Sequence, residues 1–172
     1  MKKALLIIAH EGYQQVEYNT PKALLMQAGV AVETASNKSG SAIAKDGSTA
    51  VVDMVLADVA VGQYDAILFI GGPGAMDNLD TEYSYTIARH CVEDGIPLGA
   101  ICIAPRILAK AHLLTGKRAT GWDGDGQLSD MFFTYGIEYV NEDVVVDGLI
   151  VTAAGPHAAQ EFGRQMLALI NQ

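Results

Sequence analysis

The chain has 172 residues, which fits a single domain spanning 1–172 that buries a sizeable core. Half of the residues are hydrophobic, which excludes a disordered chain, and the formal net charge of −9 argues against nucleic-acid binding, since that function needs a basic face. Two cysteines in a chain of this length do not make a disulfide framework.

The first apolar run, residues 4–9, is shorter than the hydrophobic region of a signal peptide. No other apolar stretch approaches the roughly 20 residues that span a bilayer. We therefore expect a cytoplasmic protein in a reducing compartment that makes no membrane contact.

Segments with strand character alternate with segments of helical periodicity along the whole chain. The expected strands are 4–9, 30–35, 65–70, 97–101, 119–121, 144–146 and 149–152. The expected helices are 16–28, 81–93, one opened by Pro105, 125–135 and 156–170, and Pro21 is expected to kink the first of them. A small hairpin is expected within 37–49. This alternation predicts an α/β fold with a mostly parallel sheet, in which ligands bind beyond the carboxyl ends of the strands.

Cys102 follows the buried strand 97–101, and Pro105 suits the first turn of the helix that comes next. Cys102 is therefore expected at a sharp strand-to-helix turn, the geometry of a nucleophile elbow. Peptide dipoles and free N–H groups at a helix N-terminus favour a thiolate over a thiol. The sequence thus predicts an ionised, nucleophilic sulfur at Cys102.

Glu17 lies at the start of the first helix, just after the first strand, where it is expected to reach a neighbouring strand end. A carboxyl group buried beside a thiolate should have a raised pKa and keep its proton. Glu17 would then donate a hydrogen bond to the sulfur of Cys102.

Gly71 and Gly72 end the strand 65–70, and glycine allows the backbone to approach a ligand closely. The Gly72 and Ile103 N–H groups are expected to form an oxyanion hole. Taken alone, residues 71–74 would be explained better as a simple strand-ending turn. A phosphate cradle is disfavoured, because neither G-x-G-x-x-G nor Gly-Lys-Ser/Thr is present.

Three features together resemble the ThiJ/PfpI superfamily. They are Glu17 followed by Pro21, Gly71-Gly72 at a strand end, and the elbow at Cys102 with Pro105 three residues later. This superfamily includes the Parkinson-associated redox protein and an intracellular protease-like branch. The similarity runs from the first strand to the last helix and so covers nearly the whole chain.

The resemblance implies a flavodoxin-like three-layer α/β/α sandwich of the class I glutamine amidotransferase-like type. It also implies a reactive Cys102 with Glu17 as its carboxyl partner, an oxyanion pocket at Gly72 and Ile103, and a homodimer.

The chain departs from the superfamily pattern at three places. Ile103 stands where the protease-like branch has a histidine after the cysteine, so that Cys-His dyad is absent. Trp122 stands near the position of a histidine in the redox branch and should make the pocket wall more apolar. Residues 153–154 are alanines where that branch has an arginine, which puts the anion-binding or dimer-contact role of that arginine in doubt.

Further pocket-lining candidates are residues that follow strand ends or neighbour the expected site: His10, Tyr18, Gly71, Trp122 and His157. Either histidine could act as a remote acid or base, although an exposed loop histidine is the more ordinary explanation for each. A metal site is not expected, because no H-x-x-x-H or C-x-x-C spacing is present, and neither is a cofactor.

The resulting hypothesis is a cysteine-dependent enzyme that acts on small reactive carbonyls by glyoxalase- or deglycase-like chemistry. The first alternative is a redox sensor or stress-protective protein that uses Cys102 without efficient turnover. The second is an intracellular peptidase or amidase, which would need His10 or His157 to replace the missing histidine.

Overall fold

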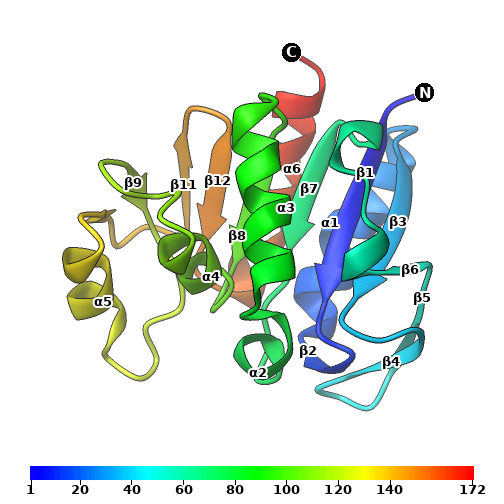
Figure 1. Cartoon of the computed structure of the whole chain (residues 1–172), viewed down its shortest axis with the longest axis horizontal. Coiled ribbons are helices and arrows are strands. Elements are labelled where there is room, and N and C mark those ends of the chain that lie inside the picture. The colour runs from blue at the N-terminus through cyan, green and yellow to red at the C-terminus, as the bar shows by residue number, and fades with distance from the viewer.

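A seven-stranded sheet forms the centre of the protein, and the computed structural model describes all residues 1–172 (Figure 1). Its strands lie in the order β11-β12-β8-β7-β1-β3-β6. Their bounds are β1 Lys3–Ile8, β3 Ala31–Ser36, β6 Met54–Val55, β7 Ala66–Phe69, β8 Leu98–Ile101, β11 Val144–Asp147 and β12 Ile150–Ala153. All neighbouring pairs are parallel except β11–β12. The predicted mostly parallel sheet is confirmed.

Helices cover both faces of this sheet, which makes a three-layer α/β/α sandwich. Helices α1 (Gln15–Gln27) and α6 (Ala159–Ile170) pack against each other on one face. Helix α3 (Glu82–Glu93) crosses the front of the sheet in Figure 1 and contacts α4 (Pro105–Lys110). The predicted flavodoxin-like sandwich is therefore confirmed.

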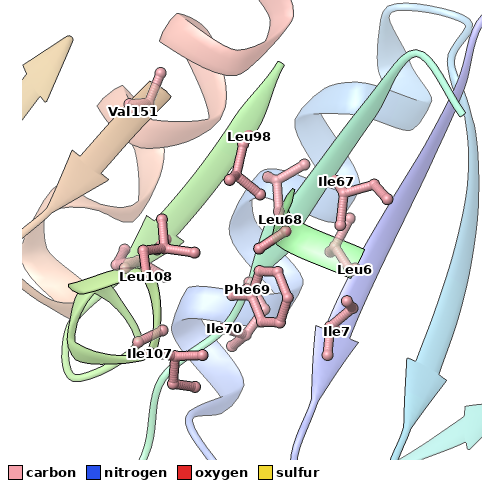
Figure 2. Packing of buried hydrophobic residues seen from close by; sticks show 14 of the residues in the cluster. Leu6, Ile7, Ile67, Leu68, Phe69, Ile70, Leu98, Ile107, Leu108 and Val151 are labelled. Carbon is pink, nitrogen blue, oxygen red and sulfur yellow. The ribbon is translucent and has the colours of Figure 1, made fainter. Parts of the chain in front are cut away.

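The central strands are apolar on both faces because helices cover both sides of the sheet. Every residue of β7 and β8 is buried, and so are five of the six residues of β1. Figure 2 shows Leu68 and Phe69 of β7 packed between β1, β8 and the α4 residues Ile107 and Leu108. Each fully buried side chain of this size contributes about 1.5–3 kcal/mol to folding.

Two small sheets lie outside the central one. Strands β2 (Glu11–Tyr13), β4 (Gly40–Ala44) and β5 (Thr49–Val52) form a three-stranded sheet, in which β4 and β5 make the predicted hairpin. Figure 1 shows this sheet at the carboxyl edge toward which β1 and β7 point. Strands β9 (Arg118–Ala119) and β10 (Glu138–Tyr139) form a two-stranded sheet.

Several local expectations need correction. The segment expected to be only a loop after β1 contains β2, whose pairing with β4 is not local in the sequence. Helix α1 continues through Pro21, and the kink expected there stays a prediction. Helix α5 begins at Leu128, and the segment after Pro156 starts with a 3-10 turn over Pro156–Ala158. Helix α2 (Ala75–Leu79) and the 3-10 turns at Leu56–Asp58 and Val61–Gln63 had no periodicity to predict them.

None of the helices combines the length and the apolar character needed to cross a lipid bilayer.

Candidate active site

Cys102 occupies the predicted elbow between β8 and α4. Its φ of 64° lies in the left-handed region, which residues other than glycine rarely adopt. Two hydrogen bonds hold this conformation: the Cys102 N–H donates to the Ala153 carbonyl at 2.8 Å, and the Cys102 carbonyl accepts from the Trp122 N–H at 2.7 Å. Backbone strain that the surroundings over-determine in this way is a feature of reactive sites.

Glu17 lies in the first turn of α1 and is completely buried. Its Oε2 accepts a hydrogen bond from the Gly71 N–H at 2.9 Å, while its Oε1 has no protein partner with good geometry. Burial raises the pKa of Glu17 from 4.5 to about 7, against the opposing effects of hydrogen bonds from Cys102 and Gly71 and of the Lys45 charge. The carboxyl group is thus poised to gain or lose a proton at neutral pH.

Gly71 brings Glu17 and Cys102 together because it has no side chain. A Cβ at this position would lie 2.7 Å from both the Cys102 Cβ and the Glu17 Oε2, and 2.8 Å from the Ile101 carbonyl oxygen. Gly72 has a φ of 122°, and a Cβ there would lie 2.5 Å from the Gln14 backbone nitrogen. Both glycines are therefore required by close approach as well as by the turn itself.

The expectation of a lowered pKa at the Cys102 thiol is wrong, although the Ile103 and Gly72 N–H groups do act in that direction. Burial, followed by the charge and hydrogen bond of Glu17, raises the pKa of Cys102 to about 12. Helix α4 has only six residues and begins three positions after the sulfur, so its dipole has little effect there. Above about pH 7 the pair therefore carries one negative charge, on Glu17, and the thiolate forms when the thiol proton moves to that carboxylate.

The Gly72 and Ile103 N–H groups lie near the Cys102 sulfur, where they favour its charged form. These are the two donors expected to form the oxyanion hole. Because they converge on the sulfur, they also lie beside any oxygen that develops on a carbon bonded to it.

A cavity of about 250 Å³ opens above the sulfur. The residues that line it are Gln14, Glu17, Lys45, Gly72, Pro73, Cys102, Ile103, Trp122 and Pro156. No cluster of three or more His, Cys, Asp or Glu side chains in the chain has an arrangement suited to a metal ion.

Five of the residues singled out from the sequence thus meet at one cavity, whereas Gln14, Lys45, Pro73 and Pro156 were missed. Three of the missed residues are close chain neighbours of predicted ones and could have been found from that proximity. Lys45 lies in the β4–β5 turn, and no local pattern points to it.

The other pocket-lining candidates lie elsewhere. The Tyr18 hydroxyl is buried against Thr34 Oγ1 at 2.7 Å, and the His10 Nε2 contacts the Ser39 carbonyl at 3.1 Å. His157 lines a different cavity, where it pairs with Asp143 at 2.9 Å. Gly71 lies behind the cavity, with its N–H on Glu17. The expectation that these four residues line the pocket is therefore corrected.

Trp122 forms a wall of the cavity and is held by Arg106. The Arg106 guanidinium forms two hydrogen bonds with the Asp125 carboxylate, at 2.7 and 2.9 Å, and one with the Trp122 carbonyl at 3.1 Å. It also lies 5.5 Å from the centre of the Trp122 ring, in cation–π geometry. The buried Arg106 thus fixes the loop that carries Trp122 over the site.

Comparison with known proteins agrees with this geometry. The sequence profile of the DJ-1/PfpI family matches residues 2–169. The chain belongs to the DJ-1/PfpI family. The predicted resemblance to the ThiJ/PfpI superfamily is therefore confirmed.

Several members of the DJ-1/PfpI family are similar to this chain over nearly its whole length. A protein named deglycase from Pyrococcus abyssi is 30% identical over 166 residues, covering 96% of this chain and 98% of that protein. Another named deglycase, from Pyrococcus horikoshii, is 30% identical over 168 residues, covering 98% of this chain and 99% of that protein. Among solved structures, a ThiJ/PfpI domain protein from Brachyspira murdochii superposes with a TM-score of 0.92 at 25% identity, covering 98% of this chain and 96% of that one. DJ-1beta from Drosophila melanogaster superposes with a TM-score of 0.86 at 26% identity, covering 99% and 91%.

Proposed function

We propose that this DJ-1/PfpI protein is a cysteine-dependent enzyme that acts on small reactive carbonyl compounds by glyoxalase- or deglycase-like chemistry. The observation that carries the proposal is the Cys102–Glu17 pair, a strained cysteine beside a buried carboxyl group with a pKa of about 7. A base with such a pKa is well matched to proton transfer near neutrality. The relatives named deglycase support the same assignment.

In the first step the Cys102 sulfur attacks the aldehyde carbon of the substrate. As the sulfur–carbon bond forms, the thiol proton passes to the Glu17 carboxylate and the carbonyl electron pair moves onto oxygen. The Gly72 and Ile103 N–H groups stabilise that oxyanion. Glu17 then returns the proton to the oxygen, which gives a neutral hemithioacetal.

A 2-oxo aldehyde such as methylglyoxal can complete the reaction without an external oxidant. The hydrogen on the former aldehyde carbon leaves as a proton to Glu17, and its electron pair forms a double bond to the neighbouring carbon. The carbonyl electron pair of that neighbour moves onto its oxygen, which gives an enediolate. Reprotonation at that neighbour leaves a thioester on the sulfur, so one carbon is oxidised while the other is reduced. Water then hydrolyses the thioester to a 2-hydroxy acid and frees Cys102.

A redox or stress-protective role is the second candidate, because the same two N–H groups that point at the sulfur would also hold a sulfinate. Cys102 is 9% exposed, whereas Cys91 is fully buried, so peroxide should reach Cys102 first. Peptide mass spectrometry after mild peroxide treatment tests this role, and equal oxidation of both cysteines would contradict it.

No histidine lines the cavity, so the peptidase or amidase alternative lacks the base that it needs. The homodimer implied by the resemblance stays a prediction, which light scattering on the purified protein would measure.

The decisive experiment follows the consumption of methylglyoxal and the formation of lactate. Cys102→Ser should abolish both, while Cys91→Ser, which changes a cysteine buried on α3, serves as the matched control and should retain them. Equal activity in the two variants would remove Cys102 as the nucleophile. A wild-type protein that neither forms lactate nor removes carbonyl adducts would contradict the enzymatic assignment.

A further inference from the structure

One cation shares the cavity with Cys102 and has no role in the chemistry described above. Lys45 is the single lysine or arginine among the nine residues that line the cavity. It stands in the turn between β4 and β5, far from Cys102 in the sequence. Its place beside the site results from the pairing of β4 with β2.

A series of backbone hydrogen bonds fixes this turn to the catalytic pair. The Lys45 N–H donates to the Tyr13 carbonyl at 2.7 Å, and the next residue, Gln14, donates to the Gly71 carbonyl at 3.0 Å. The Gly71 N–H in turn donates to the Glu17 carboxyl at 2.9 Å. The turn itself is closed by a hydrogen bond from the Ala44 N–H to the Ser48 carbonyl at 2.8 Å. These hydrogen bonds therefore hold the backbone of Lys45 in a fixed position relative to Glu17.

The ammonium group of Lys45 has no partner within the protein. Eight of the 11 lysines and arginines form ion pairs, in a chain whose net charge is −9. Of the remaining three, Lys22 donates to the Tyr18 hydroxyl, whereas Lys38 and Lys45 make no side-chain hydrogen bond or ion pair. Lys45 differs from Lys38 in lining the cavity, where its charge also acts on Glu17.

The other lining groups leave this cation unmatched once a substrate binds. When the thiol proton moves to Glu17, the carboxyl group becomes neutral and the negative charge passes to the sulfur and then to the substrate oxygen, which Gly72 and Ile103 stabilise. Trp122, Pro73 and Pro156 offer apolar surface. An anionic group on the far end of the substrate is what Lys45 can bind.

We propose that Lys45 is a specificity-determining residue that binds an anionic substituent, a carboxylate or phosphate, on the carbonyl substrate attacked by Cys102. The inference rests on the proposed function for the reaction that the substrate undergoes. The presence of an anion-binding group beside the sulfur does not depend on that function. The proposal predicts that acidic 2-oxo aldehydes are better substrates than neutral ones such as methylglyoxal.

The anion preference can be measured without any catalytic turnover. Iodoacetate and iodoacetamide differ in charge and little in shape, and both alkylate a thiol by forming a sulfur–carbon bond with loss of iodide, while Glu17 takes the thiol proton. The readout is the ratio of the two rate constants at Cys102, followed by mass spectrometry in a Cys91→Ser background.

Lys45→Met should lower the iodoacetate-to-iodoacetamide ratio about three- to tenfold at low salt, the range expected for one charge near a protein surface. Lys45→Arg should keep the ratio close to that of the wild type. Lys38→Met is the matched control, since it removes an exposed lysine outside the cavity, and should leave the ratio unchanged. A Lys45→Met ratio equal to that of the wild type, or an equal fall in Lys38→Met, would overturn the proposal.

A second comparison distinguishes this proposal from the proposed function. The wild type should convert 4,5-dioxopentanoate with a higher kcat/KM than its neutral methyl ester, and Lys45→Met should reduce that preference about three- to tenfold. The same comparison with 2-oxo-3-phosphooxypropanal, which carries a phosphate in place of the carboxylate, tests whether a phosphate gives a higher kcat/KM. No turnover of any compound would contradict the proposed function, whereas turnover without a charge preference would contradict only the role of Lys45.

Discussion

Glu17 and Cys102 meet at a single point in the structure, the position of the absent Gly71 side chain, which lies 2.7 Å from the carboxyl oxygen of one and from the Cβ of the other. This close approach makes the thiol and the carboxyl group share one negative charge once the pair has lost its first proton, near pH 7. Both the reactivity of the site and its dependence on pH follow from that sharing.

Gly71→Ala should disable the site. The added methyl group must push apart the Cys102 side chain, the Glu17 carboxyl group and the Ile101 backbone, and overpacking of this kind costs about 1–3 kcal/mol. We expect lower stability in urea denaturation together with a large loss of methylglyoxal turnover. Gly62→Ala is the matched control, because a Cβ there meets nothing within 4 Å. A fully active Gly71→Ala variant would show that the close approach is not needed.

Glu17→Gln should reduce kcat/KM for methylglyoxal by about 100-fold or more, which is the usual contribution of a general base. The amide keeps the shape of the side chain but cannot accept the thiol proton. Steady-state kinetics between pH 6 and 9 would measure the effect, with Glu11→Gln, an exposed residue of β2, as the control. An equal loss in both variants, or none in either, would remove Glu17 from the mechanism.

Glu17 should also make the protein less stable as the pH rises from about 4.5 to about 7. In this window the unfolded chain releases the Glu17 proton while the folded protein retains it, so deprotonation favours unfolding. Between pH 5 and pH 8 the free energy of unfolding should fall by about 2–3 kcal/mol more in the wild type than in Glu17→Gln. Urea denaturation at the two pH values measures this difference, and identical pH profiles would contradict the raised pKa.

Arg106→Met should release the loop that carries Trp122. The substitution leaves the Asp125 carboxylate without its bidentate partner and the Trp122 carbonyl without its donor, at a cost of about 2 kcal/mol. Trp122 is the single tryptophan of the chain, so its fluorescence reports directly on the loop. We expect a shifted emission maximum and easier quenching by iodide or acrylamide. Unchanged fluorescence would show that other contacts hold the loop.

The elbow and its partner could be predicted from the sequence because local patterns determine them. A buried strand followed by Cys102 and then by Pro105 specifies a strand-to-helix turn, and the start of α1 after β1 places Glu17 at the same edge of a parallel sheet. The glycines that end β7 mark the third component. Each of these features needs only the sequence around it and the rule that parallel strands end together.

The remaining features depend on contacts between distant segments. Lys45 reaches the cavity because β2 pairs with β4, and no hydrophobic periodicity in the sequence predicts that pairing. A residue that follows a strand end lies near the edge of the sheet, but its sequence position does not determine where its side chain points. For this reason His157 was expected at the site, whereas it pairs with Asp143. The sign of the Cys102 pKa shift depends on burial and on the charge of Glu17, which outweigh the Ile103 and Gly72 N–H groups.

The pH dependence of Cys102 alkylation tests the central claim most directly. Iodoacetamide labelling of the Cys91→Ser protein, followed by mass spectrometry from pH 5 to 10, gives the rate constant at Cys102 alone. The account predicts a rise with an inflection near pH 7 in the wild type, as the pair loses its first proton, and no such inflection in Glu17→Gln. Profiles that coincide in the two proteins and rise only as an isolated thiol ionises would contradict a proton shared between Glu17 and Cys102.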